Sequence, residues 1–163
     1  MKTLFLLFFV SFSPFVIEGP SMEPTFIDDE IIVIEEGQSQ EAVYGRGDIV
    51  VFSFDDAPGY YYVKRIIGEP GESLHIKKDG IYVDDENGEE VMLDEPYVGD
   101  GVSSALVSEA YRNNYKHTYV IPDDKYFVLG DNRAHSLDSR YFKDPFITKS
   151  EIKGKYVFNL TNL

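Results

Sequence analysis

Three segments of this 163-residue sequence carry side chains that could take part in chemistry. The first is Gly19–Thr25, in which Ser21 lies between Pro20 and Pro24. Each proline fixes its own φ angle and removes a backbone donor, so the loop that carries the hydroxyl is stiff. A serine held in this way could act as a nucleophile, but it could equally be an ordinary turn hydroxyl.

The second segment, Tyr61–Gly71, contains Lys64. Side chains alternate along a strand, so Lys64 would share a face with Tyr62 and Ile66. Burial beside such neighbours disfavours the ammonium and lowers its pKa from about 10.4. A pKa between about 7.5 and 8.5 would suit a general base, at a desolvation cost of roughly 3–4 kcal/mol. The alternative is a lysine whose stem packs on apolar surface while its head reaches water.

The third segment, Val128–Arg140, begins as an apolar strand and continues as a dense polar loop. If this loop is even partly buried, its charged side chains must satisfy one another through hydrogen bonds and ion pairs. The alternative is an exposed loop with turns made by its Asp and Asn side chains.

The elements that must position these groups are predicted to be strands. Tyr and Phe number 12 each, Trp is absent, and turn signals separate runs rich in β-branched and aromatic residues. Helical candidates are short: Ser103–Arg112 and a turn at Lys149–Lys153. The sequence therefore predicts a mostly β protein, with strands at Ile31–Glu35, Asp48–Phe54, Tyr60–Ile67, Ser73–Lys77, Gly80–Val83, His117–Ile121, Tyr126–Leu129 and Lys155–Phe158.

Residues 84–110 are acidic and rich in loops, and we expect them to belong to a β subdomain inserted at 74–125. Asp79-Gly80 and Asn87-Gly88 are good hairpin turns. The run Asp84–Gly88 superficially suggests a calcium loop, but it lacks the alternating ligands and the distant Glu of an EF-hand. A solvated hairpin tip is the preferred interpretation.

Charge and composition exclude several functions. The net charge of −14 disfavours nucleic acid as a partner, because the phosphate backbone would be repelled. The absence of cysteine excludes disulfides, thiolate metal sites and a cysteine nucleophile. The three histidines are scattered, so no metal site is predicted.

The N-terminus is apolar from Leu4 to Ile17, after a single Lys2. As a helix this run would span about 21 Å, against roughly 30 Å of hydrocarbon. It could be a cleaved secretory signal, a short anchor, or the remainder of a longer anchor. We favour a short membrane helix over residues 1–17, which by the positive-inside rule places residues 18–163 outside the cytoplasm.

Together, the segments SMEPT, YVKRIIGEPGE and LGDNRAHSLDSR closely resemble the signature boxes of type I signal peptidases, also called leader peptidases. Gly47–Phe52 resembles a fourth box, and the order and spacing of the boxes also match. The resemblance is to the short, Gram-positive-like form. It implies a membrane-bound serine endopeptidase that removes signal peptides from exported preproteins, with Ser21 as nucleophile and Lys64 as general base.

The same resemblance implies supporting roles. Ser136 would orient the Lys64 amine, Asp138 would pair with Arg140 and Arg65, and Met22 would keep water from the amine. In some relatives a hydroxyl two residues before the nucleophile helps to form the oxyanion hole. That position is Gly19 here, so the second oxyanion donor is left open.

The family fold implied is an antiparallel, barrel-like β-sheet domain at a membrane surface. Its substrate is bound as an added strand, and small side chains are preferred at the first and third positions before the cut. The edges that would bind it are Phe15–Pro20 and Tyr60–Lys64, near Ile17, Gly19 and Tyr62. The resemblance implies signal peptides and membrane lipid as partners, and no cofactor.

Other interpretations compete with this one. A Ser–His–Asp triad could involve His135, and Ser150–Lys153 fits an S-x-x-K pattern without its companion motifs. A self-cleaving repressor shares the Ser–Lys chemistry but carries a basic DNA-binding module. A signal-peptidase-like processing or assembly factor of a pilus or transfer system is the main alternative function.

Overall fold

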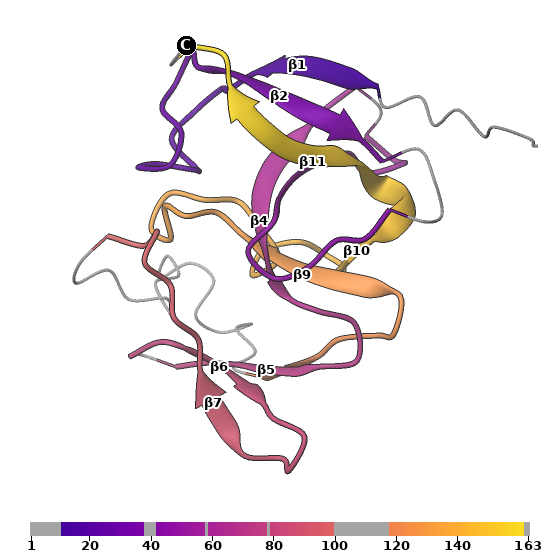
Figure 1. The fold of residues 1–163 in the computed structure, drawn as a ribbon. Helices are drawn as coiled ribbons and strands as arrows, with labels where there is room; N and C mark the ends of the chain where they lie inside the picture. Colours follow the sequence, from indigo (N-terminus) through magenta and orange to yellow (C-terminus); the bar gives the residue numbers. More distant parts are fainter. Residues whose placement is uncertain (1–10, 38–41, 58, 78, 100–117, 162–163) are drawn as a thin grey trace, which may run out of the picture.

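In the computed structural model, the described residues (11–37, 42–57, 59–77, 79–99 and 118–161) form two antiparallel β-sheets (Figure 1). The mostly β, antiparallel prediction is confirmed. The larger sheet has the strand order β1 (Phe12–Val16), β2 (Ile31–Glu36), β11 (Ile152–Asn159), β3 (Ile49–Phe52), β4 (Tyr62–Gly68), β9 (Lys125–Leu129) and β10 (Ile147–Thr148). The smaller has the order β7 (Glu90–Met92), β6 (Ile81–Asp84), β5 (Ser73–Ile76) and β8 (Thr118–Val120).

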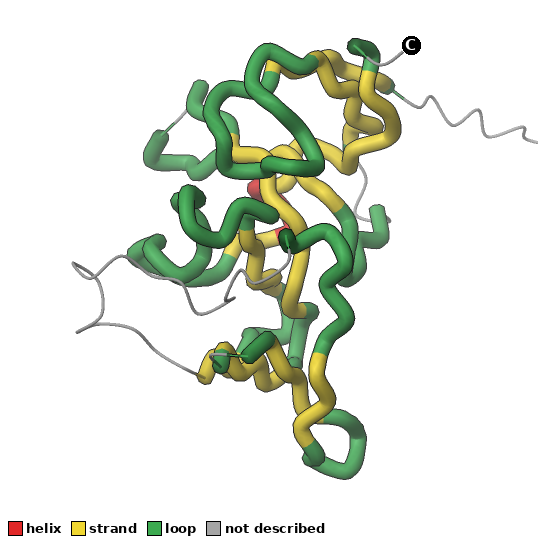
Figure 2. The backbone as a smooth tube through the Cα atoms, turned by 90° about the vertical axis from the view of Figure 1, so that its left-hand side faces the viewer, coloured by secondary structure: helices red, strands yellow, loops and turns green. Residues whose placement is uncertain are grey.

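The two sheets lie one above the other along the long dimension of the molecule (Figure 2). A continuous apolar cluster joins them: Ile67, Phe127 and Leu129 of the large sheet pack with apolar residues of the small sheet, among them Leu74, Ile76, Ile81 and Tyr119. Burial of each such side chain stabilises the fold by about 1.5–3 kcal/mol, so the small sheet is a packed part of the structure.

Strands β3 and β4 lie at the centre of the large sheet and are buried on both faces. All four residues of β3 are buried, as is β4 from Lys64 onward. In their antiparallel register Val50 lies opposite Lys64, and Phe52 lies opposite Tyr62. Paired residues share a face, so Lys64 is placed among apolar side chains.

The predicted N-terminal membrane helix is wrong over the part that the structure describes. Phe12–Val16 form strand β1, which pairs with β2 from Phe12↔Glu35 to Val16↔Ile31. Residues 1–10 lie outside the described residues. Within the described part of the chain, no helix has the length and apolar character needed to cross a membrane. A short apolar run suits a strand as well as a helix, and here pairing with β2 selects the strand.

The other strand predictions are confirmed with ends shifted by a few residues. The turn predicted at Lys149–Lys153 is a 3₁₀ helix, η2, at Lys149–Glu151. The helix predicted at Ser103–Arg112 lies outside the described residues, and the 74–125 boundary of the inserted subdomain stays a prediction. Strands β1, β7 and β10 were not predicted, because the last two are very short and β1 lies inside the apolar run.

Candidate active site

Ser21 and Lys64 contact each other in a cleft that both residues line. Ser21 lies in the loop between β1 and β2, and Lys64 lies on β4. The Lys64 Nζ atom is 2.7 Å from Ser21 Oγ and 2.8 Å from the carbonyl oxygen of Val63. Lys64 is only 3% exposed. The amine is thus held by two oxygen atoms in a site that water hardly reaches.

The surroundings of Lys64 favour its neutral form. Burial lowers the pKa of this amine from 10.5 to about 8. The negative charges of Asp138 and Asp131 oppose that change, whereas the positive charge of Arg140 adds to it. A large fraction of the amine is therefore neutral near pH 8, and only a neutral amine can accept a proton from the serine hydroxyl.

The loop that carries Ser21 is fixed by the polar loop that follows β9. The backbone N–H of Asn132 donates to the Ser21 carbonyl oxygen at 3.2 Å, and its side-chain Nδ2 donates to the Pro20 carbonyl oxygen at 3.0 Å. Gly19 has φ +82°, and its N–H donates to Asp28 Oδ1 at 2.6 Å. Glycine adopts such a φ without strain, so the chain can turn just before the nucleophile.

Gly130 permits the close approach of these two loops. A Cβ atom added at Gly130 would lie 2.3 Å from the Ser21 carbonyl oxygen and 2.3 Å from Ser136 Oγ. Any side chain here would push the Ser21 backbone away from its position. Glycine is therefore needed at position 130 because the backbone of the nucleophile leaves no space for a side chain.

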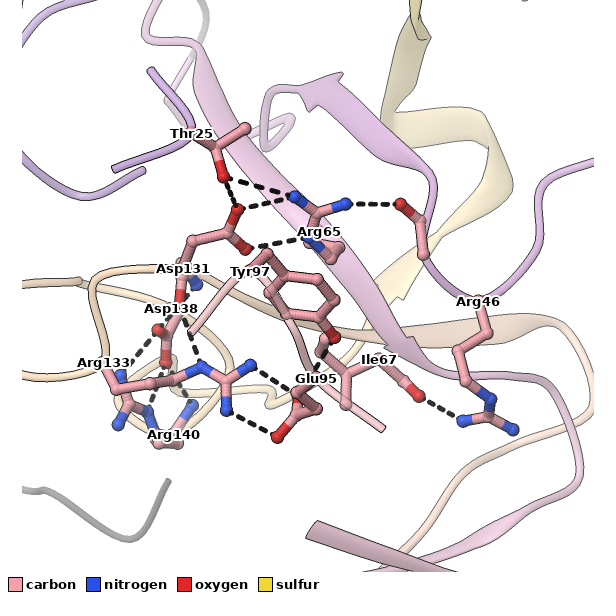
Figure 3. Close-up of polar contacts among 12 residues, drawn as sticks. Thr25, Arg46, Arg65, Ile67, Glu95, Tyr97, Asp131, Arg133, Asp138 and Arg140 are labelled. Carbon is pink, nitrogen blue, oxygen red and sulfur yellow. Dashed lines mark hydrogen bonds and ion pairs between the residues drawn. The ribbon is translucent and has the colours of Figure 1, made fainter. Parts of the chain in front are cut away.

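Arg65 and Asp138 are both in buried ion pairs, but not with each other (Figure 3). The expected pairing of Asp138 with Arg65 is wrong: Arg65 Nε and Nη2 donate to the carboxylate of Asp131 at 2.9 and 2.6 Å. Asp138 accepts two bonds of 2.8 Å from Arg140, as predicted for that pair. Arg65 follows Lys64 on β4 and points to the opposite face, where Asp131 lies, so alternation along the strand explains the difference.

Ser136 does not bind the Lys64 amine in this structure, contrary to expectation. Its Oγ atom is buried and has no hydrogen-bond partner among the described residues. It lies against Gly130 instead. The second oxygen partner of the Lys64 amine is instead the Val63 carbonyl, at 2.8 Å.

Met22 is 1% exposed and belongs to the apolar cluster with Ile17, Phe26 and Ile32. It also lines the cleft beside Lys64. Its burial fits the expected part in keeping water from the amine, which stays a prediction.

The arrangement of His135 does not form a Ser–His–Asp triad. His135 is exposed, and its Nδ1 atom lies 3.3 Å from the Asn132 side-chain oxygen. Asp138 is engaged by Arg140. No group of three His, Asp or Glu side chains among the described residues could hold a metal ion.

An open cleft of about 540 Å³ extends from the Ser21–Lys64 pair. One wall comes from residues 15–22 and the other from residues 59–64, and His135 and Leu137 also line the cleft. Phe15 of one wall and Tyr61 of the other are in edge-to-face contact, with ring centroids 5.1 Å apart. Ile17, Gly19 and Tyr62, the positions predicted to lie near the substrate, all line this cleft.

The structure also places two residues near the site that the sequence did not single out. Glu95 binds Arg133, and the Tyr97 ring lies against Arg65 (Figure 3). Both residues lie in the loop-rich acidic segment, where no hydrophobic period or turn signal distinguishes them.

A serine hydroxyl that contacts a buried lysine amine beside an open cleft is the arrangement used by serine hydrolases of the Ser–Lys kind. The family model described as "Signal peptidase, peptidase S26" matches residues 1–161. The chain therefore belongs to the signal peptidase family S26.

Relatives support the same assignment. Signal peptidase I S of Bacillus subtilis is 39% identical over 155 residues, which cover 90% of this chain and 77% of that protein. A signal peptidase I of Bacillus amyloliquefaciens is 40% identical over 154 residues, covering 90% and 76%. A crystal structure of a signal peptidase I from Enterococcus faecalis matches with a TM-score of 0.50 and 31% identity, covering 71% of this chain and 98% of that one.

These findings make the chain a serine endopeptidase that removes signal peptides. They favour this activity over that of a dedicated processing or assembly factor of a pilus or transfer system.

Proposed function

We propose that Ser21 is the nucleophile and Lys64 the general base with which this signal peptidase cleaves its precursors. One observation carries the proposal: the buried amine of Lys64 lies 2.7 Å from the Ser21 hydroxyl oxygen. That distance allows direct proton transfer, and the lowered pKa of Lys64 makes the neutral amine available.

The chemistry proceeds in two halves. Neutral Lys64 removes the Ser21 proton as Oγ attacks the scissile carbonyl carbon. The resulting ammonium returns that proton to the leaving amine as the C–N bond breaks, which leaves an ester on Ser21. The amine then takes a proton from water, whose oxygen attacks the ester, and the proton goes back to Ser21 Oγ. Proton and electron balance requires no other reactant.

The developing oxyanion needs hydrogen-bond donors. The backbone N–H of Ser21 is one candidate. The N–H of Gly19 already donates to Asp28, so this group does not serve as the second donor in the observed arrangement. Because a single donor can be worth about 3–4 kcal/mol, the second donor matters for the rate, and its identity stays open.

The precursor would bind as an extended strand within the 540 Å³ cleft. Among the described residues, strand β1 is at the edge of its sheet and pairs on one side only, with β2. Backbone pairing along such an edge gives affinity without sequence preference, whereas the cleft walls select side chains at alternate positions. We expect small residues at the first and third positions before the cut.

The enzyme would work at a membrane surface, as a single-pass protein with its catalytic domain on the extracytoplasmic side. The support is the apolar sequence that precedes strand β1, which has Lys2 at its start, together with Glu18 and Glu23 after β1. Membrane lipid would then be a second partner beside the signal peptides of exported preproteins.

The test is cleavage of an exported precursor by the purified protein in detergent, with N-terminal sequencing of the product. Ser21→Ala and Lys64→Ala should each abolish cleavage, whereas His135→Ala should retain it within about threefold. Full activity in Lys64→Ala would refute the assigned base, and a dead His135→Ala variant would restore the triad.

A further inference from the structure

The Ser21 loop, strand β4 and the polar loop after β9 are tied to a fourth segment that the mechanism above does not use. This segment, residues 93–98, follows β7 and runs from the small sheet toward the large one (Figure 1). Its backbone is anchored by the Leu93 N–H, which donates to the Ile81 carbonyl at 2.8 Å, and by the Val98 N–H, which donates to the Glu95 carbonyl at 3.0 Å. Leu93 and Tyr97 pack against the apolar cluster between the sheets.

Glu95 holds Arg133 from this segment. Arg133 Nη1 and Nη2 donate to the two carboxylate oxygens of Glu95 at 3.1 and 2.6 Å, and the side chain of Arg133 is fully buried. Arg133 Nε donates to the Gly130 carbonyl at 3.1 Å. A two-pronged pair of this kind fixes orientation as well as charge, so Glu95 sets the shape of the turn from Gly130 to Arg133.

That turn is the one that holds the nucleophile. Asn132 precedes Arg133 and donates hydrogen bonds to the carbonyl oxygens of Ser21 and Pro20. A change in the turn would therefore move the backbone of the serine directly.

Tyr97 contacts strand β4, which carries Lys64. Its ring lies 3.9 Å from the guanidinium carbon of Arg65, the residue after Lys64 on β4. Figure 3 shows the ring between the Arg65–Asp131 pair and the Arg133–Glu95 pair, and the Tyr97 hydroxyl donates to Glu95 Oε1 at 3.1 Å. A cation stacked on an aromatic ring and shielded from water is held more firmly than one in solvent.

From these contacts we infer that Glu95 and Tyr97 are positioning residues for the Ser21–Lys64 pair: Glu95 acts through Arg133 and Asn132 on the serine, and Tyr97 acts through Arg65 on the lysine strand. The inference rests on the proposed roles of Ser21 and Lys64. It gives the segment after β7 a part in catalysis, although neither residue lines the cleft.

The contacts of Glu95 with Arg133 and of Tyr97 with Arg65 act on the segments that carry Ser21 and Lys64, so catalysis should be sensitive to both. Displacement of a reacting group by about 1 Å can lower a rate roughly 100-fold, while substrate binding along the cleft walls is left unchanged. A positioning role therefore predicts a loss in kcat with KM retained.

The experiment measures kcat and KM for Glu95→Gln, Tyr97→Leu and Tyr97→Phe, with thermal unfolding to establish that each variant is folded at the assay temperature. Glu95→Gln and Tyr97→Leu should lower kcat about 10- to 100-fold, with KM within about threefold of the unchanged enzyme. Tyr97→Phe keeps the ring over Arg65 and should recover most of the rate lost in Tyr97→Leu.

Glu90→Gln is the matched control, because it removes the same charge on strand β7, five residues before Glu95, at an ion pair with Lys77 whose side chains are both about 40% exposed. It should leave kcat unchanged. A folded Tyr97→Leu with normal kcat would overturn the inference, as would failure of both Glu95→Gln and Tyr97→Leu to fold, since that would assign them to stability alone. Ser21→Ala run alongside separates the two proposals: if it retains activity, the proposed function itself has failed.

Discussion

The amine of Lys64 lies 2.7 Å from the hydroxyl of Ser21, although 43 residues separate them in the chain. The contact joins a stiff loop to a central strand, and the same amine is held a second time by the Val63 carbonyl. A neutral amine in this position can donate an N–H to the Val63 carbonyl and accept the proton of the Ser21 hydroxyl, which is what a general base requires.

The first prediction concerns the pH dependence of cleavage. Lys64 must be neutral to act as a base, and burial lowers its pKa to about 8. Below that value kcat/KM should rise about tenfold per pH unit, and it should level off near pH 9. The profile is measured on one precursor from pH 5.5 to 10. A profile that is flat through pH 8, or falls there, would remove Lys64 from the role of base.

The second prediction concerns stability. The folded state binds Lys64 protons less tightly than the unfolded state, whose pKa is 10.5, so between about pH 8 and 10.5 the unfolded chain carries more protons and stability rises with pH. At pH 7 the cost of burying this amine is up to about 3 kcal/mol. Lys64→Met should therefore be inactive but more stable by about 1–3 kcal/mol at pH 7.

Urea unfolding at a series of pH values checks this expectation. The gain from Lys64→Met should shrink as the pH approaches 10.5, because the lysine of the unfolded chain then also loses its proton. A Met variant less stable than the starting protein at pH 7 would show that the two hydrogen bonds of Lys64 outweigh its desolvation.

The third prediction concerns Gly130. A methyl group there would lie 2.3 Å from the Ser21 carbonyl oxygen, so Gly130→Ala must displace the backbone of the nucleophile. We expect kcat/KM to fall at least 100-fold and stability to fall by about 1–3 kcal/mol. Gly45→Ala is the control, because its new methyl group would meet only the end of the Glu69 side chain at 3.2 Å. Equal kinetics for the two variants would contradict the argument.

The fourth prediction concerns the buried pair of Arg65 and Asp131, whose side chains are 11% and 0% exposed. Asp131→Asn leaves the guanidinium without its counter-charge and should destabilise the fold by about 3–5 kcal/mol. The double variant Arg65→Met with Asp131→Leu should be less damaging than the single one, since no charge is left buried alone. Chemical denaturation of the double variant and of its two components, Arg65→Met and Asp131→Leu, measures the coupling. A double variant that costs the sum of these two single variants would argue against a coupled pair.

Much of the fold could be predicted from local patterns. Alternating β-branched and aromatic residues between turn signals marked the positions of β2, β3, β4 and β9, because these strands are held by side chains that the sequence displays directly. Strand β1 could not be identified in this way. Its residues form one apolar run with those before it, and only pairing with β2 separates a strand from a membrane helix there.

The candidate site, like the fold, could be predicted in part from the sequence. Ser21 and Lys64 stood in motifs whose combination pointed to one chemistry, and the structure brings them together. The partners of the charged and polar residues were harder to predict. Arg65 was expected to pair with Asp138 but pairs with Asp131. Ser136 was expected to bind Lys64 but has no hydrogen-bond partner among the described residues. Which of several nearby carboxylates an arginine binds depends on how the loop after β9 folds.

The sequence by itself determined the kind of chemistry and the strands that carry it, because residue type and alternation are local properties. Only the tertiary structure decided which groups lie within hydrogen-bonding distance, how deeply Lys64 is buried, and that Glu95 and Tyr97 reach the site. Those properties depend on contacts between segments far apart in the chain, and the energy of a buried charge changes with every such contact.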